Sequence, residues 1–174
     1  MQPTLYEVER IGTGRLAVMG RPRAGDWASD EFAGLARLGV TDIVSLLEPS
    51  EAHELDLAEE PAYCAAAGIR FYSFPIKDRG VPTSSEDLAR LACRLYHSCA
   101  AGRFAAVHCR AGIGRSGLVG AAVLIHGGFT VRDALSAISK ARGVQVPDTN
   151  EQGEWLSRYR SAISRCDLNQ LQPY

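Results

Sequence analysis

The sequence lacks both an apolar run long enough to cross a bilayer and an excess of charge of one sign. Its longest apolar stretches, around Leu118–Ile125 and Ala105–Val107, fall well short of the ~20 residues that a membrane-spanning helix needs. Its 19 lysines and arginines are balanced by 20 aspartates and glutamates, which leaves a net charge of -1. We therefore expect no membrane anchor and no general affinity for nucleic acid, so any anion must bind at a local site.

The sequence also lacks the cysteine spacing of a disulfide framework or a zinc site. Its five cysteines are odd in number and lie far apart, whereas both kinds of site use cysteines at characteristic spacings. The N-terminal segment carries Glu7 and Glu9 ahead of a glycine-broken stretch, not the basic region and apolar core of a secretory signal. We therefore expect a cytoplasmic protein in which one cysteine is available for chemistry.

No internal repeat, low-complexity tract or linker interrupts the chain. With 174 residues, 46% of them hydrophobic and 22% charged, it has the composition of an ordinary globular protein with a sizeable core. We expect a single domain over residues 1–174 and a monomer.

Short apolar runs alternate with amphipathic segments, which is typical of an α/β fold. Strands are expected at Leu16–Met19, Ile43–Leu47, Arg70–Pro75 and Phe104–Cys109. Helices are expected to begin near Ser29, after Pro49-Ser50 with an interruption at Pro61, after a capping box of Thr83 and Glu86, near Arg115, after Thr130, and near Asp148 or Thr149. The pattern predicts a central twisted, mostly parallel sheet of about four or five strands flanked by helices, with a phosphate-binding loop between a strand and a helix.

The segment HCRAGIGRSG, residues 108–117, lies between a predicted strand and a predicted helix. From Gly112 to Gly117 it satisfies G-x-G-x-x-G, the dinucleotide fingerprint. That interpretation requires a parallel strand after the helix and an acidic residue about 20 positions further on. Here the next predicted element is another helix, and Asp133 lies in its first turn. The dinucleotide interpretation is therefore disfavoured.

Starting from Cys109, the same segment places a nucleophile at an anion-binding turn. Backbone N–H groups of a tight turn that enters a helix converge on one point, where the helix dipole favours negative charge. Arg115 adds a planar, two-pronged donor that matches two phosphoryl oxygens. A helix N-terminus and a nearby cation favour a thiolate, so we expect Cys109 to be an ionised nucleophile. The residues predicted to bind phosphate are Arg110, Ala111, Gly112, Ile113, Gly114 and Arg115.

Three further residues have predicted roles beside the nucleophile. Ser116 can donate its hydroxyl to the sulfur and help the thiolate to leave. Asp78, in a turn-rich loop between Pro75 and Pro82, is the candidate general acid and, later, the base for the attacking water. His108 is expected to orient the loop by bonding to backbone behind the turn, because a side chain just before the nucleophile on a strand points away from it.

The loop HCRAGIGRSG resembles the signature H-C-x-x-G-x-x-R-(S/T)-G of the cysteine-dependent protein tyrosine phosphatase superfamily at every fixed position. The segment FPIKDRGVP, residues 74–82, is similar to the general-acid loop of its compact dual-specificity members. The run GIGRSGLVGAAVL and the T-x-x-Q stretch at 149–152 look most similar to the kinase-associated phosphatase type. The resemblance implies that Cys109 forms a phosphocysteine during hydrolysis of a phosphate monoester. We expect no metal or other cofactor, since a thiolate and an arginine take over charge neutralisation.

Two interpretations of Gln152 stay open. In the family a glutamine often positions the attacking water, and the resemblance implies this role for Gln152. However, Thr149-x-x-Gln152 is also a capping box, in which the glutamine bonds backbone at the start of a helix. Asp148 stands where related tyrosine phosphatases carry another glutamine, so the group that positions water is left undecided.

Arg110 bears on the substrate, because basic residues in this loop resemble those of phosphoinositide and inositol phosphate phosphatases. A second basic residue commonly occupies the position of Ile113 in such enzymes, and no polybasic segment is present here. We therefore expect a phosphorylated protein or peptide as substrate, with phosphotyrosine first and phosphoserine or phosphothreonine as further substrates. The alternatives are a phosphoinositide or inositol phosphate phosphatase, a catalytically silent phosphate-binding module, and a sulfur transferase.

Overall fold

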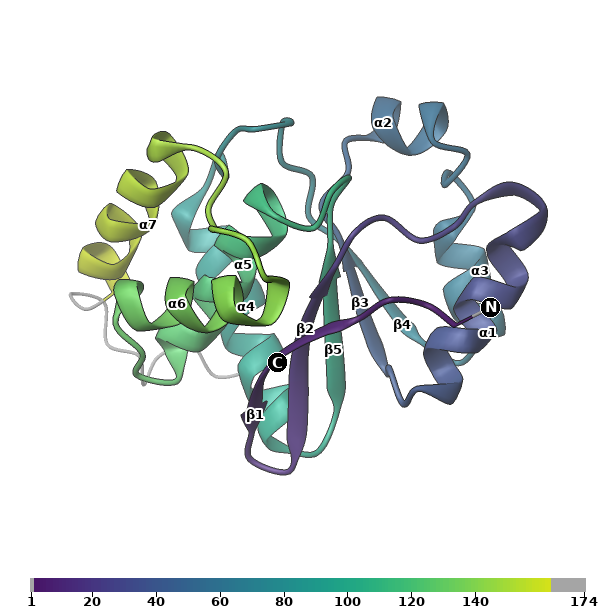
Figure 1. Cartoon of the computed structure of the whole chain (residues 1–174), viewed down its shortest axis with the longest axis horizontal. Coiled ribbons are helices and arrows are strands. Elements are labelled where there is room, and N and C mark those ends of the chain that lie inside the picture. Colours follow the sequence, from purple (N-terminus) through teal and green to yellow (C-terminus); the bar gives the residue numbers. More distant parts are fainter. Residues whose placement is uncertain (1, 164–174) are drawn as a thin grey trace.

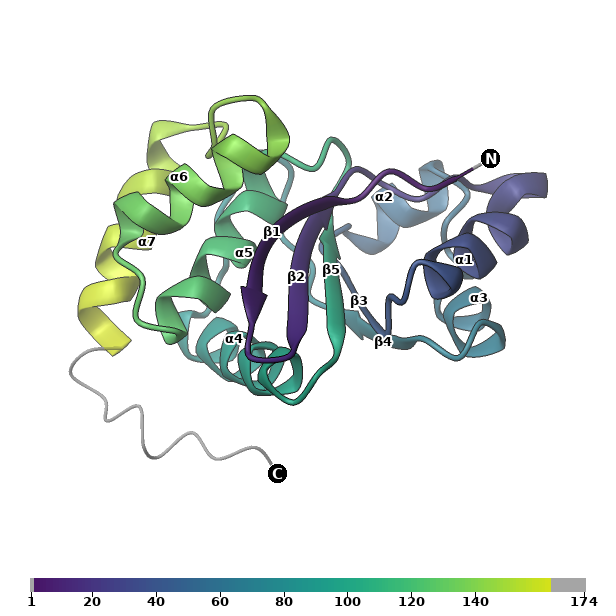
Figure 2. The same ribbon diagram turned by 60° about the horizontal axis from the view of Figure 1, so that its bottom comes forward.

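The computed structural model describes residues 2–163. A five-stranded sheet lies between two groups of helices (Figures 1 and 2). The strands are β1 (Tyr6–Ile11), β2 (Gly14–Met19), β3 (Asp42–Ser45), β4 (Arg70–Ser73) and β5 (Phe104–His108), in the order β1-β2-β5-β3-β4. β1 is antiparallel to β2, and all other neighbouring pairs are parallel. The predicted α/β fold with a mostly parallel sheet is confirmed.

The helices cover both faces of this sheet. They are α1 (Ala28–Arg37), α2 (Pro49–Glu54), α3 (Glu60–Ala66), α4 (Ser85–Ala100), α5 (Gly114–His126), α6 (Val131–Arg142) and α7 (Asn150–Ile163), with a short 3-10 helix η1 (Gly25–Trp27) before α1. Helices α4 to α7 gather on one side of the sheet, and α1 and α3 lie on the other (Figure 1). Between residues 2 and 163, no helix combines the length and the apolar character needed to cross a membrane.

Strand β2 shows how the sequence supplies both cores. Successive side chains of a strand point to opposite faces of the sheet. Leu16 and Val18 accordingly pack into the core with α4 and α5, whereas Ala17 and Met19 pack into the smaller core with α1. Parallel strands buried on both faces have nearly continuous apolar sequences, which is why β2, β3 and β5 were predicted.

Strand β1 was not predicted, because its sequence has no such apolar run. Glu7, Glu9 and Arg10 are charged, and most of the strand is partly or fully exposed. It pairs with β2 at the edge of the sheet, with a register shift between Glu7 and Glu9. An edge strand with one covered face does not need a continuous apolar sequence.

Two predicted details at helix ends were wrong. Pro61 does not interrupt a helix; it lies in the first turn of α3, where a residue without an N–H loses no hydrogen bond. The cap of α4 is Ser84, whose hydroxyl accepts from the Asp87 N–H at 3.1 Å, rather than the box of Thr83 and Glu86. Both errors displace a boundary without changing the element.

The carboxyl ends of the four parallel strands meet at one edge of the sheet, which is where ligands bind in open α/β folds. The loop after β5 leads directly into α5, whose residues from Gly114 to Ile125 are all buried. A helix packed on every side holds its first turn in place. The fold therefore presents the loop 109–113 on a rigid support.

Candidate active site

A cavity of about 210 Å³ lies at the carboxyl edge of the sheet, where the loops after β4 and β5 meet the segment before α7. Its lining residues are Asp78, Arg79, Cys109, Arg110, Ala111, Ile113, Gly114, Arg115, Asp148 and Gln152. The structure thus brings together the predicted nucleophile, acid, arginine and glutamine from three separate segments. Gly112, Ser116 and His108 are buried behind this wall.

Cys109, the predicted nucleophile, lines the cavity and is only 3% exposed. The Gly112 N–H donates to Cys109 Sγ at 3.3 Å, and Ser116 Oγ lies 3.5 Å from the same sulfur. Gly112 has φ +73°, and a Cβ there would lie 2.5 Å from the carbonyl carbon and oxygen of Met19. Only glycine satisfies both the backbone conformation and this close approach.

Hydrogen-bond donors that the sequence did not predict hold the outer side of the loop 109–113. Arg142, the last residue of α6, donates from Nε to the Gly112 carbonyl at 2.7 Å and from Nη2 to the Ala111 carbonyl at 3.2 Å. The Arg21 N–H donates to the Arg110 carbonyl at 3.1 Å. Since the carbonyl and N–H of a trans peptide point in opposite directions, binding these carbonyls on the outside favours N–H groups on the inside.

Arg115 is locked in place by a carboxylate from α2. Its side chain is 2% exposed, and both of its terminal nitrogens bond to Glu51, at 2.6 and 3.0 Å. Nη1 also donates to the Ile76 carbonyl at 2.9 Å, and Nη2 lies 3.0 Å from Asp78 Oδ1. This bidentate geometry fixes the plane of the guanidinium. Glu51 was not predicted as a site residue, although a buried arginine requires such a partner.

The charges of Arg115 and Glu51 stabilise each other against burial. Burial raises the pKa of Glu51, but hydrogen bonds from Arg115 and from the Glu48 N–H outweigh it and leave the pKa below its ordinary value. Burial lowers the pKa of Arg115, but Glu51, Cys109 and Asp78 outweigh it and leave the pKa raised. The guanidinium beside Cys109 therefore stays charged.

Asp78 lies at the mouth of the cavity on an exposed loop between β4 and α4, with 59% of its side chain exposed. Two contacts tie this loop to the segment around the start of α7. Arg79 Nη1 lies 3.4 Å from Asp148 Oδ2, and Gln152 Nε2 donates to the Gly80 carbonyl at 3.0 Å. The loop therefore holds the Asp78 carboxylate next to the arginine at the cavity.

The capping interpretation of Gln152 is confirmed. Its Oε1 accepts from the Thr149 N–H at 3.3 Å, and its own N–H donates to Thr149 Oγ1 at 3.2 Å. The same buried side chain also lines the cavity and bonds to Gly80. One residue thus closes the first turn of α7 and holds the Asp78 loop; water positioning stays a prediction.

His108 is fully buried, and its partner differs from the expected one. Its Nε2 lies 2.8 Å from Glu60 Oε1 of α3, so a carboxylate rather than backbone holds this ring atom. Within residues 2–163, its Nδ1 has no hydrogen-bond partner.

Arg110 also has acidic partners: its Nη2 donates to Glu54 Oε1 at 3.1 Å, and its Nε lies 3.7 Å from Glu51 Oε1.

The buried cysteines elsewhere in the chain have a different environment. Burial and the charge of Glu60 raise the pKa of Cys64 to about 12. Burial likewise raises the pKa of Cys99 to about 11. These thiols stay protonated and pack as small apolar groups. Cys166 lies outside the described residues.

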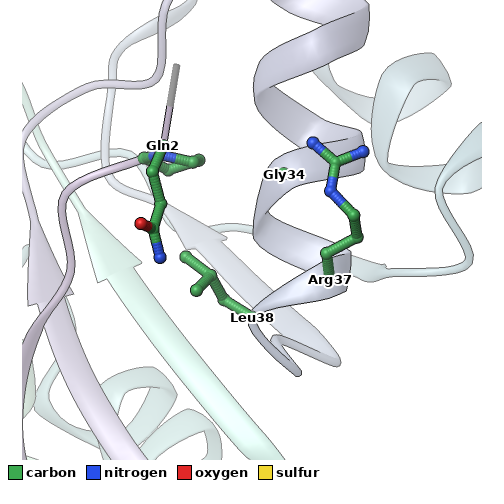
Figure 3. Close-up of a pocket in the computed structure, with 5 residues that line it drawn as sticks. Gln2, Gly34, Arg37 and Leu38 are labelled. Carbon is green, nitrogen blue, oxygen red and sulfur yellow. The ribbon is translucent and has the colours of Figure 1, made fainter.

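Another pocket, of about 300 Å³, lies between the N-terminal segment and α1 and contains no catalytic chemistry. It is lined by Gln2, Pro3, Gly34, Arg37 and Leu38 (Figure 3). These side chains include no nucleophile and no acid. In the part of the chain that the structure describes, no group of three or more histidines, cysteines or acids is placed to hold a metal ion.

The comparison with known protein families agrees with the geometry of the loop 109–113. A family model described as "Polymorphic toxin system, DSP-PTPase phosphatase" matches residues 17–129, well over half of the chain. This chain belongs to that phosphatase family. The match runs from β2 to just beyond α5, so it includes Asp78, Cys109 and Arg115 but neither Asp148 nor Gln152. The protein is therefore a phosphoric monoester hydrolase of the cysteine-based protein tyrosine phosphatase superfamily.

Solved structures share the whole architecture of this DSP-PTPase phosphatase. Kinase-associated phosphatase, crystallised with its catalytic-site cysteine replaced by serine, is 18% identical, with a TM-score of 0.82 over 94% of this chain and 97% of that one. Tk-PTP in its active form is 29% identical, with a TM-score of 0.71 over 92% and 99% of the two chains. The resemblance to the kinase-associated phosphatase type is confirmed at the level of the fold.

A curated relative matches a shorter segment of the DSP-PTPase phosphatase. The Arabidopsis thaliana protein PTEN1, named a phosphatidylinositol 3,4,5-trisphosphate 3-phosphatase and protein-tyrosine-phosphatase, is 36% identical over 86 residues. The match covers 45% of this chain and only 20% of the length of that protein.

Proposed function

We propose that this enzyme hydrolyses phosphate monoesters of proteins or peptides through a phosphocysteine on Cys109, with phosphotyrosine as the first substrate. The observation that carries the proposal is the convergence of three groups on one cavity. Cys109 lies at its base, Arg115 Nη2 lies at its wall, and Asp78 Oδ1 lies 3.0 Å from that nitrogen at its mouth.

In the first step, Cys109 Sγ attacks phosphorus, an S–P bond forms and the bond to the leaving oxygen breaks. Arg115 and the loop N–H groups bind the remaining phosphoryl oxygens, whose charge is spread in the transition state. Asp78 delivers a proton to the departing oxygen. Because Asp78 already lies beside Arg115 Nη2, a phosphoryl group bound to that nitrogen is next to the acid.

In the second step, water attacks phosphorus, Asp78 takes a proton from it, and the S–P bond breaks. Ser116 Oγ, 3.5 Å from the sulfur, donates to the departing thiolate. Gln152 uses only one N–H of its amide on Gly80, which leaves a second amide hydrogen for the attacking water. In this proposal the glutamine caps α7 and positions water at once.

The charge around Arg110 favours a protein substrate over a phosphoinositide. Arg110 lines the cavity, as a lipid-directed enzyme requires, but Glu54 and Glu51 accompany it. Two carboxylates next to one guanidinium reduce its attraction for the extra phosphates of an inositol ring. The PTEN1 relative, whose name covers both activities, makes the phosphoinositide the second substrate to test.

The decisive experiment is hydrolysis of an activated aryl phosphate in excess EDTA under reducing conditions, with wild type and Cys109→Ser. Activity that survives the chelator and disappears in the variant supports the phosphocysteine route. A burst experiment should recover a phosphoryl group on Cys109 at low pH. Activity that remains in folded Cys109→Ser contradicts the proposal, and a folded but inactive wild type indicates a silent phosphate-binding module.

A further inference from the structure

The turn that carries Asp78 has a backbone conformation that arginine rarely adopts. The Gly80 N–H donates to the Lys77 carbonyl at 2.8 Å, so Asp78 and Arg79 are the two central residues of a four-residue turn. Arg79 has φ +57°. A turn with a positive φ at its third residue usually has glycine or asparagine there, because a Cβ is crowded in this conformation. Arg79 therefore carries backbone strain directly after the predicted general acid.

An ion pair at the mouth of the cavity accounts for an arginine at this strained position. Arg79 and Asp148 line the cavity from two different segments, and Arg79 Nη1 lies 3.4 Å from Asp148 Oδ2. Glycine or asparagine at position 79 would relieve the strain but would bring no charge to Asp148. Strained residues persist where the surrounding structure holds them, and they gather at functional sites. The strain at Arg79 thus accompanies a contact that joins the turn to the segment before α7.

Asp148 stands on a rigid part of the fold. A Cβ at Gly114, the first residue of α5, would lie 2.8 Å from Asp148 Cβ and 3.0 Å from Gln152 Oε1. Both side chains therefore pack directly on a position that only glycine leaves open. Since α5 is buried along almost its whole length, this support does not shift easily. Asp148 thus presents a fixed carboxylate to the cation on the turn.

Substrate binding changes the contacts that hold the turn in place. In the structure Asp78 Oδ1 lies 3.0 Å from Arg115 Nη2, but in the proposed reaction the transferring phosphoryl group binds to Arg115. Two anions then compete for one guanidinium. Two contacts that do not involve Arg115 stay in place, namely the ion pair at the cavity mouth and the hydrogen bond from Gln152. The position of the acid during the reaction therefore depends on these two contacts.

We propose that Asp148 is a positioning residue for the general acid. Through the guanidinium of Arg79 it holds the Asp78 carboxylate at the leaving oxygen while a phosphoryl group occupies Arg115. The inference rests on the proposed function, because it requires Asp78 as the acid. Asp148 acts only through Arg79 and does not touch the reacting atoms.

The test removes each end of the ion pair in turn. Asp148→Asn deletes the carboxylate, and Arg79→Asn deletes the cation with a residue that adopts a positive φ readily. An exposed ion pair changes an equilibrium by up to about fivefold. Each variant should therefore slow formation of the phosphocysteine from a phosphotyrosine peptide, measured in a single turnover, by about three- to fivefold. Arg79→Lys retains the charge and should restore most of the wild-type rate, and Arg132→Asn, at an exposed arginine of α6, is the matched control that should leave the rate unchanged.

Three further measurements separate positioning from a merely structural role. In an Asp78→Asn background neither variant should slow the first step further, because the ion pair acts through the acid. With an activated aryl phosphate, whose leaving group needs little help from an acid, each loss should shrink to less than about twofold. Both variants should bind inorganic phosphate as wild type does, and Arg79→Asn should unfold at a temperature no lower than wild type, since the substitution relieves backbone strain.

Three results would overturn this inference and leave the proposed function intact. The first is a wild-type rate in both variants, and the second is a loss that adds to that of Asp78→Asn. The third is an Asp148→Asn variant that forms the phosphocysteine at the wild-type rate but hydrolyses it slowly, since Asp148 would then act on the attacking water. By contrast, a wild-type rate in Asp78→Asn itself, or activity in folded Cys109→Ser, would contradict the proposed function and the inference with it.

Discussion

The two edges of the sheet each hold a buried carboxylate bound by arginine, and only one of these arginine sites lines the cavity of Cys109. At the amino edge, Asp42 accepts from Arg70 Nε at 2.7 Å and from Arg103 Nε at 2.8 Å. At the carboxyl edge, Glu51 accepts from both terminal nitrogens of Arg115. The same two residue types therefore serve two purposes in one fold.

The difference lies in whether the arginine is buried together with its carboxylate partner. At the amino edge the acid is buried, while the side chains of Arg70 and Arg103 are 49% and 37% exposed and reach inward from the rim. At the carboxyl edge the arginine is itself buried and still lines the cavity of Cys109. A buried acid with exposed arginines ties three strands together, whereas a buried, charged arginine facing a cavity attracts an anion.

The largest difference is expected when one arginine is removed at each edge and the losses of activity are compared. Arg115→Ala should lower kcat/KM by at least about a thousandfold, because it removes the donor to the transferring phosphoryl group. Arg70→Ala should leave kcat/KM within about twofold, since it lies at the opposite edge. Steady-state kinetics and thermal unfolding of both variants check this. A similar loss of activity in both would erase the distinction between the edges.

Phosphate binding separates the arginine from the nucleophile at the carboxyl edge. Cys109→Ser should abolish turnover but retain binding of inorganic phosphate, whereas Arg115→Ala should lose both. Titration calorimetry with phosphate measures the difference. Equal loss of binding in the two variants would contradict the assigned roles.

Asp78→Asn should have the next largest effect, and it should depend on the leaving group. A general acid contributes about 10²–10⁴-fold, and that contribution matters most when the leaving oxygen is a poor leaving group. We expect a strong loss with a phosphotyrosine peptide and a smaller loss with an activated aryl phosphate. A uniform loss across a series of aryl phosphates would assign Asp78 a structural role instead.

Glu51→Gln tests the pH dependence of the ion pair at the carboxyl edge. Because the pKa of Glu51 is lowered in the folded protein, its charge stabilises the fold above its ordinary pKa of 4.5, and this contribution is lost as the pH falls through the lowered value. The free energy of unfolding of the wild type should exceed that of the variant by about 1–3 kcal/mol at pH 7. This difference should become progressively smaller below pH 4.5. Urea unfolding at several pH values measures both. A gap that does not change with pH would show that the charge of Glu51 does not stabilise the fold.

Thr149→Ala and Gln152→Ala should give the smallest effects. Both remove one half of the cap of α7, at a cost of about 1 kcal/mol. Only Gln152→Ala also releases the Gly80 carbonyl, so only this variant should lower kcat, by a few-fold to about tenfold. Identical kinetics in the two variants would show that Gln152 only caps α7 and does not contribute to turnover.

The elements predicted well from sequence are those whose signal is local. The central parallel strands β2, β3 and β5 have apolar runs, Thr130 caps α6 as expected, and the capping box of Thr149 and Gln152 forms. Strand β1 was missed because an edge strand with alternating charges depends on β2 for its pairing. The cap of α4 moved by one residue because Thr83 and Ser84 are adjacent and both suited to the position.

The sequence by itself determined which residues form the loop 109–113 and its flanks, because they are contiguous. A glycine that must adopt φ +73°, a cysteine at the end of a buried strand and an arginine in the first turn of a buried helix all lie within residues 108–117. Local backbone geometry then brings the Gly112 N–H to Cys109 Sγ.

Only the tertiary structure decided what surrounds this loop. Glu51, Glu60 and Arg142 reach it from α2, α3 and α6, and no local pattern distinguishes them from other charged helical residues. Their selection depends on which helix packs at which end of the sheet. A buried charge is stable only next to its partner, so the fold that brings these residues together also completes the site.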